Sequence, residues 1–210
     1  MTGELNLPLI LLAAFVATAS PGPATLAISG LSMSTGRRYG LAMAAGVTTG
    51  SLVWSIAAAF GLGAVMLANA WAFEVIRYCG AGYLLYLAYK SARSAMTKGK
   101  TISPQAFANS YRTAYIKGLA LHLTNPKAIL FFGSLYSVGI PEGAPISSLA
   151  LVIAAVGLQS VIVFHGYALL FSNAPLIAGY TRLRRWFEGV FAVVFATAGL
   201  KILTAHLTED

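Results

Sequence analysis

Long apolar segments separated by short polar ones dominate the pattern along this chain. Six segments are long enough to cross the hydrocarbon core of a bilayer, which takes roughly 20 helical residues. The pattern therefore predicts an all-α membrane protein with six transmembrane helices, at Leu5–Met33, Gly40–Leu67, Tyr78–Ala95, Gly118–Val138, Ile146–Ser172 and Phe187–His206. No Lys or Arg precedes the first segment, so we interpret it as a retained span rather than a signal peptide.

Two of the predicted spans contain residues that interrupt a helix. The first span contains Ser20–Pro23, in "TASPGPATLAISG", and the fourth contains Asn125–Lys127, in "TNPKAILFF". Each proline removes a backbone donor and clashes with the carbonyl four residues earlier. We expect a new helix to begin at each break, with Ser20 and Asn125 as N-caps and first turns that contain Pro21, Pro23 and Pro126.

A broken helix inside a membrane indicates a binding site, because its unpaired backbone groups are tolerated only where they are buried in protein or line a cavity. The N-terminus of a helix attracts anions, and Gly22 would let a ligand approach the backbone. The alternative is that the prolines only kink packed helices. We predict a substrate site that contains Ser20, Pro21, Gly22, Pro23, Thr48, Asn125, Pro126 and Lys127.

The two breaks occupy corresponding positions in two halves of the chain. We predict a first three-helix repeat over residues 1–95, a cytoplasmic connecting loop over 96–117 and a second repeat over 118–210. Ser103 and Pro104 could begin a short interfacial helix in this loop. Because three spans per half is an odd number, the halves cross the membrane in opposite senses, which is the arrangement of transporters with inverted repeats.

The charge distribution follows the predicted topology. The chain is 58% hydrophobic and 10% charged, with a net charge of +8. Eleven of its 14 basic residues fall in the connections between spans 1 and 2, 3 and 4, and 5 and 6, or, for Lys90 and Arg93, at the adjoining end of span 3. The positive-inside rule therefore places these connections in the cytoplasm and both termini in the periplasm. The basicity reflects topology, so we expect the bilayer as a partner and no nucleic acid.

A few polar residues inside the spans are candidates for function. Lys127 is the charge that falls well inside a span, where it would bind a substrate carboxylate or form part of a gate; alternatively, it snorkels to the interface. We expect no buried carboxylate in the spans, so protons would have to use His122 or His165, the substrate itself or another group. Each histidine is alternatively a hydrogen-bonded structural group.

Enzymatic chemistry is not indicated. The sequence has no nucleotide-binding loop, no G-x-S-x-G motif and no H-E-x-x-H motif. The single cysteine, Cys79, excludes a disulfide framework. We therefore predict that the protein has no catalytic residues, cofactor or metal site.

The chain resembles the lysine exporter (LysE/RhtB) family of bacterial inner-membrane amino-acid exporters along essentially its whole length. The resemblance rests on "SPGP" at 20–23, "GRRYGLAMAAGVTTG" at 36–50, "GAGYLLYLAYKS" at 80–91, "LTNPKAILFF" at 123–132 and "GVFAVVFATAGLKIL" at 189–203. It departs from the family at Ala88, where a glycine is expected. The resemblance implies about six helices and export of amino acids or related metabolites, driven by the proton gradient. We predict that this export proceeds by alternating access.

The sequence predicts the class of protein more closely than it predicts the substrate. A site that contains Lys127 and no acid offers no counter-charge to a cationic side chain, which favours a neutral amino acid such as homoserine or threonine. The alternative is a membrane scaffold that transports nothing, which would tolerate bulky residues near the breaks but not on lipid-facing glycines such as Gly46 and Gly50. Homo-oligomerisation is left open.

Overall fold

The computed structural model describes residues 5–68, 70–97, 108–141 and 143–204, and this part of the chain contains helices and no strands. The predicted interfacial helix at Ser103 and Pro104 lies outside the described residues. The helices are α1 (Leu7–Ala19), α2 (Pro23–Ser34), α3 (Arg37–Ala68), α4 (Ala70–Met96), α5 (Tyr111–Leu123), α6 (Pro126–Gly139), α7 (Ile146–Leu170) and α8 (Ala174–Thr204).

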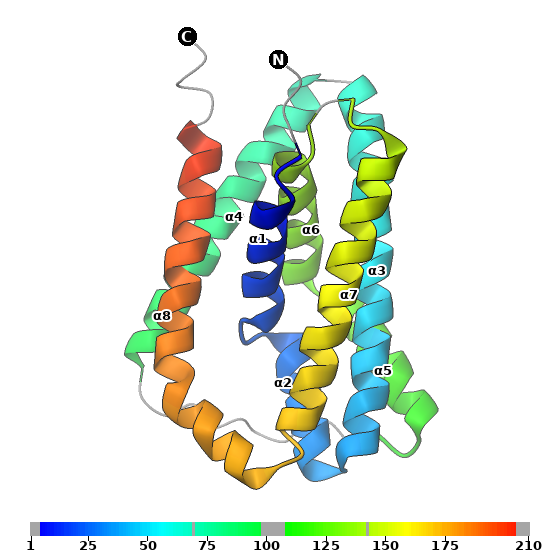
Figure 1. Ribbon diagram of the computed structural model, residues 1–210, viewed down its shortest axis with the longest axis vertical. Coiled ribbons are helices and arrows are strands. Elements are labelled where there is room, and N and C mark those ends of the chain that lie inside the picture. The colour runs from blue at the N-terminus through cyan, green and yellow to red at the C-terminus, as the bar shows by residue number, and fades with distance from the viewer. Residues whose placement is uncertain (1–4, 69, 98–107, 142, 205–210) are drawn as a thin grey trace.

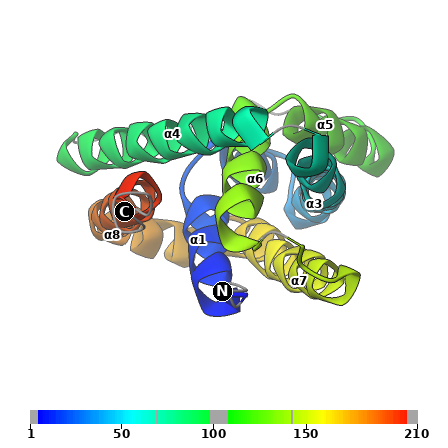
Figure 2. The same cartoon turned by 90° about the horizontal axis from the view of Figure 1, so that it is seen from above.

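The helices form one bundle that contains two broken helix pairs, with α1 and α6 near its centre (Figure 1, Figure 2). The α1–α2 pair runs from the end of the bundle that holds both termini to the opposite end, and the α5–α6 pair runs the other way (Figure 1). Viewed along the bundle, α1 and α6 lie between α4 and α8 on one side and α3 and α7 on the other (Figure 2). This arrangement brings both breaks to the middle of the bundle.

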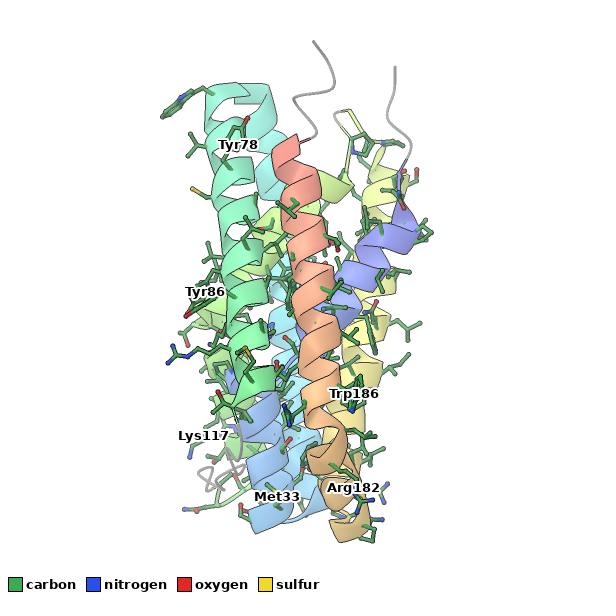
Figure 3. All side chains as sticks on the ribbon, turned by 90° about the vertical axis from the view of Figure 1, so that its left-hand side faces the viewer. Met33, Tyr78, Tyr86, Lys117, Arg182 and Trp186 are labelled. Atoms are coloured by element: carbon green, nitrogen blue, oxygen red, sulfur yellow. The ribbon has the colours of Figure 1, made fainter. Side chains whose placement is uncertain are left out.

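The basic connections gather at one end of the bundle. Lys117 and Arg182 lie at the same end as Met33, whereas Tyr78 lies near the opposite end (Figure 3). Arg37, at the start of α3, follows the short turn after α2 at this end. The helices thus bring together basic residues that are far apart in the sequence, as the positive-inside pattern requires.

The fold is that of an all-helical membrane protein, and its helices differ in how clearly they span a membrane. Within the described residues, Arg37–Gly61 and Ile146–Leu170 are each long and apolar enough to cross a bilayer. Together α1 and α2 form a third candidate, with a bend of 51° at the break. The helix that contains the last predicted span, α8, begins before Phe187, at Ala174, and Pro175 suits its first turn.

One prediction about buried charge is wrong. Glu188 lies in α8 and is only 4% exposed. Its Oε1 accepts a hydrogen bond of 3.0 Å from the Ser94 hydroxyl of α4. This carboxylate follows directly after Phe187, beside the basic residues at 182–185, so it reads as the edge of a polar segment in the sequence. The packing of α4 against α8 places it inside the protein.

Glycines bring α3 and α5 into backbone contact. A Cβ atom at Gly46 would collide with the carbonyl oxygen of Tyr115, and one at Gly118 would collide with that of Met43. Gly46 and Gly50 are both buried, so their expected lipid-facing position is wrong. Small residues that allow backbones to approach closely are typical of membrane helix interfaces. Intolerance of bulk at these glycines therefore does not distinguish a scaffold from a transporter.

We expect Gly46→Leu to destabilise the protein by about 3 kcal/mol, because the clash is with backbone that no rotamer change can move. The measurement is the melting temperature of the purified protein in detergent. Gly61→Leu is the matched control on the same helix, since a Cβ atom at Gly61 meets nothing within 4 Å. Equal melting temperatures for the two variants would contradict the α3–α5 contact.

Candidate functional site

The first break separates α1 from α2 over three residues. Ser20 ends α1: its backbone N–H donates to the carbonyl of Val16 at 2.9 Å, and its hydroxyl donates to the carbonyl of Ala17 at 3.1 Å. The N-cap of α2 is Gly22, and Pro23 is its first residue. The predicted N-cap function of Ser20 is therefore wrong, because its hydroxyl bonds back to the helix that it ends. Pro21 lies between the two helices.

The start of α2 presents backbone donors at the break. The Thr25 hydroxyl oxygen accepts the Gly22 N–H at 2.9 Å, which holds the first turn in place. The first backbone bond of the helix runs from the Leu26 N–H to the Gly22 carbonyl, at 2.9 Å. The N–H groups of Ala24 and Thr25 precede this bond and have no acceptor within the helix. This end of α2 is consequently electropositive.

The second break is shorter and is capped as predicted. Asn125 is the N-cap of α6: its side-chain oxygen accepts the Lys127 N–H at 3.0 Å, and its carbonyl accepts the Ala128 N–H at 2.9 Å. Pro126 occupies the first helical position, where its missing donor costs nothing. Asn125 is 6% exposed, so the cap forms inside the protein.

Lys127 joins the two breaks. Its ammonium group donates to the carbonyl oxygen of Ser20 at 3.2 Å and to the Ser20 hydroxyl. The side chain therefore does not snorkel towards the membrane surface. A Cβ atom at Gly22 would lie 3.3 Å from the Lys127 ammonium nitrogen and 3.4 Å from its Cδ, so the glycine leaves space for this lysine. The cation lies beside the electropositive start of α2.

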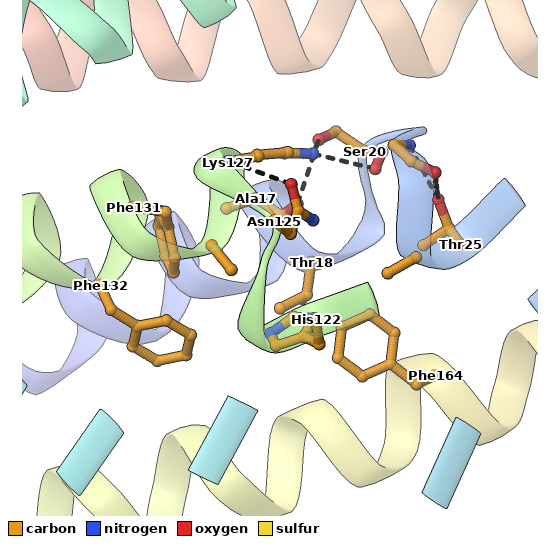
Figure 4. A pocket seen from close by; sticks show the side chains of 13 residues that line it. Ala17, Thr18, Ser20, Thr25, His122, Asn125, Lys127, Phe131, Phe132 and Phe164 are labelled. Atoms are coloured by element: carbon orange, nitrogen blue, oxygen red, sulfur yellow. Dashed lines mark hydrogen bonds between the residues drawn. The ribbon is translucent and has the colours of Figure 1, made fainter. Parts of the chain in front are cut away.

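A pocket opens between the two breaks. Lys127 and Ser20 lie on one side of it, His122 and Phe164 lie on the other, and Thr18 lies between them (Figure 4). Alanines and aromatic rings complete the wall. The lining residues are Ala17, Thr18, Ser20, Gly22, Ala24, Thr25, His122, Asn125, Lys127, Ala128, Phe131, Phe132 and Phe164.

The pocket includes some of the predicted site residues and leaves out others. Ser20, Gly22, Asn125, Lys127 and His122 come together, from the two breaks and from helices α5 and α6. Thr48 of α3 does not line the pocket, nor does His165 of α7, whose Nδ1 lies 3.0 Å from the carbonyl of Val161 on its own helix. Pro21 and Pro23 shape the first break without lining the pocket, and Pro126 begins the helix after the second break.

Several lining residues gave little or no signal in the sequence. Thr25 resembles the many small polar residues that pack helices, and Thr18 donates to the carbonyl of Ala14 in its own helix at 2.7 Å. Phe164 comes from α7, and nothing about one phenylalanine in an apolar helix indicates which way it points. The aromatic residues of "ILFF" were visible in the sequence, but only the turn at Asn125 directs Phe131 and Phe132 into the pocket.

The chemistry of the pocket suits an organic anion. It offers an ammonium group, the N-terminus of a helix and neutral polar side chains, and none of its lining residues is acidic. Among the residues that the structure describes, no group of three or more His, Cys, Asp or Glu gathers as a metal site would require. The ammonium group and the helix N-terminus together can bind a carboxylate.

An apolar helical bundle with a buried lysine in a pocket between two broken helices is an arrangement typical of membrane transporters. Residues 15–206 match the LysE type translocator family, and the chain belongs to that family. Family membership makes the protein a translocator in a membrane and not an enzyme, and it favours transport over the scaffold alternative.

Relatives match the chain over nearly its whole length. Threonine efflux proteins of Salmonella typhi and Escherichia coli (strain K12) are 30% identical, over 91% of this chain and 94% of each relative. An uncharacterized membrane protein of Pseudomonas aeruginosa is 31% identical over 90% of both chains. No solved structure matches the chain significantly.

Proposed function

We propose that the protein exports a neutral amino acid, of the threonine or homoserine kind, across the bacterial inner membrane. The observation that carries this proposal is the ammonium group of Lys127 at the start of α2, where a carboxylate would neutralise it. The names of the threonine efflux relatives support the substrate class.

The pocket accounts for selection of a neutral side chain. The substrate carboxylate would replace the Ser20 contacts of Lys127, and the freed backbone carbonyl of Ser20 would accept hydrogen bonds from the substrate's α-ammonium group. A cationic side chain would find no acid among the lining residues and would be repelled by Lys127.

We propose that the two halves form inverted three-helix repeats that rock against each other around this pocket. The opposite directions of the α1–α2 and α5–α6 pairs support this proposal (Figure 1). The basic end would face the cytoplasm and both termini the periplasm. In this arrangement the six spans are the α1–α2 pair, α3, α4, the α5–α6 pair, α7 and α8.

The experiment is efflux of radiolabelled amino acids from proteoliposomes that contain the purified protein. The panel includes threonine, homoserine, valine, lysine and glutamate. Efflux of the neutral hydroxy-amino acids that exceeds efflux from protein-free vesicles supports the proposal. Efflux of lysine or glutamate in preference to them, or of no amino acid, contradicts it.

We further propose that proton coupling uses Glu188. Glu188 is a buried carboxylate in the interface between α4 and α8, where the Ser94 hydroxyl donates a hydrogen bond to it. Lys127 on α6 interacts electrostatically with both Glu188 and Lys90 of α4, and Arg185 precedes Glu188 by about one turn on α8. The described residues of α1, the other helix packed against α8, include no titratable group.

We expect Glu188→Gln to abolish stimulation of transport by an imposed pH gradient but to retain counterflow, the exchange of internal for external substrate. Glutamine has a similar shape and can accept the Ser94 hydrogen bond, but it cannot bind and release a proton. Ser94→Ala is the matched control, because it removes the hydrogen bond and leaves the carboxylate. Stimulation of the glutamine variant by the gradient to the wild-type extent would exclude Glu188 as the coupling group.

A further inference from the structure

His122 is a buried polar side chain without a polar partner. It lies in the last turn of α5, is 5% exposed, and neither of its ring nitrogens has a hydrogen bond within the described part of the chain. Buried polar groups in native proteins are almost always hydrogen-bonded, so such an exception requires an explanation. Ser29, Ser32, Thr48 and Trp54 have similarly unpaired atoms, but none of them lines the pocket between the breaks.

Apolar contacts hold the imidazole ring of His122. A Cβ atom at Gly50 of α3 would lie 2.9 Å from the His122 Cβ and 3.3 Å from its Cδ2, so the ring packs where this glycine leaves space. On another side the ring meets Phe164 edge to face, with centroids 5.8 Å apart. The surrounding helices therefore fix the position of the ring without using its nitrogens, which leaves them for a ligand in the pocket.

The pocket has two polar regions, and His122 provides the second. Lys127 and Ser20 form the first, and the imidazole lies across the pocket from them (Figure 4). The charge of Lys127 acts on His122, so it disfavours a second positive charge there, whether an ammonium group or a cationic side chain. A neutral imidazole has one donor and one acceptor nitrogen, and a hydroxyl group can pair with either of them.

We propose that His122 hydrogen-bonds the side-chain hydroxyl of the transported amino acid and determines specificity for hydroxy-amino acids over apolar ones of the same shape. The inference rests on the proposed function, since it assumes that the carboxylate binds at Lys127. A valine in the same position would leave the imidazole buried and unpaired, whereas threonine would satisfy it. A site built in this way rejects the analogue that lacks the hydroxyl.

The test compares threonine with valine, which have nearly the same shape, by the ratio of their kcat/KM values in proteoliposome counterflow. A ratio does not depend on how much of a variant is correctly folded. We expect a wild-type preference for threonine of about 10- to 100-fold, the range for leaving one buried polar group unpaired. His122→Phe should reduce the preference to less than about 3-fold while valine transport continues, and His122→Gln should retain part of it.

His165→Phe is the matched control, because that ring is bonded to its own helix and lies outside the pocket. It should leave the ratio unchanged. If His122→Phe does not insert, His122→Leu replaces it with the same expectation. A wild-type protein that transports valine as well as threonine, a His122 variant with the wild-type ratio, or inserted variants that transport neither amino acid would each overturn the proposal. A wild-type protein that transports no amino acid would instead refute the proposed function itself.

Discussion

Replacing Lys127 with methionine is expected to reduce threonine efflux at low substrate concentration by about 10- to 100-fold. A hydrogen bond to a charged group contributes about 1.5–3 kcal/mol, and the variant removes the one ammonium group in the pocket. Methionine preserves most of the volume of the lysine stem, so the break at Ser20 should keep its shape. The measurement is the initial rate of efflux from proteoliposomes as a function of substrate concentration.

Two further variants serve as controls for Lys127→Met. Lys127→Arg retains the positive charge and should retain part of the activity. Lys117→Met removes an exposed lysine of α5 at the basic end of the bundle and should transport at the wild-type rate. If Lys127→Met inserts normally and exports as fast as Lys117→Met, the pocket between the breaks is not the substrate site.

Gly22→Leu is expected to abolish export while the protein still inserts into the membrane. Even the Cβ atom of the new side chain would lie 3.3 Å from the Lys127 ammonium nitrogen, so the rest of the leucine must displace the lysine or fill the pocket. The φ of Gly22 is −159°, which any residue adopts, so the expected loss reflects blocked space rather than a strained backbone. Efflux and binding of threonine are measured on the purified variant.

Gly133→Leu is the control for the Gly22 substitution. It places the same side chain on a broken helix, α6, at a position where a Cβ atom meets nothing within 4 Å. We expect normal export from this control. Undiminished threonine binding by Gly22→Leu would show that the ligand does not approach the start of α2.

The two breaks show how far the sequence predicts the site. Proline in a long apolar segment located both interruptions, and Asn125 was correctly predicted as an N-cap because its short side chain can reach only the N–H groups just after it. Ser20 was assigned to the wrong helix, because a serine hydroxyl can bond either forwards to the next helix or back to the one before. Its bond to Ala17 became visible only in the folded chain.

Lys127 and Glu188 likewise show how far the sequence predicts the position of a charged side chain. The sequence identified Lys127 as an unusual charge in a membrane segment. A lysine side chain is long enough, however, to place its ammonium group either at the membrane interface or inside the protein. Only the position of Ser20, 107 residues away, places the ammonium group at the other break. Glu188 was overlooked because it neighbours a basic, apparently exposed segment, and its burial depends on contact with α4.

By itself the sequence determined the class of protein, the apolar helices and the places where two of them break. These properties follow from local chemistry: hydrophobic length, the missing donor of proline, and the charges between spans. The tertiary structure decided which side chains meet. Whether a residue such as His122, Lys127 or Glu188 is paired, unpaired or exposed depends on helices that pack against it from distant parts of the chain, so no local pattern encodes it.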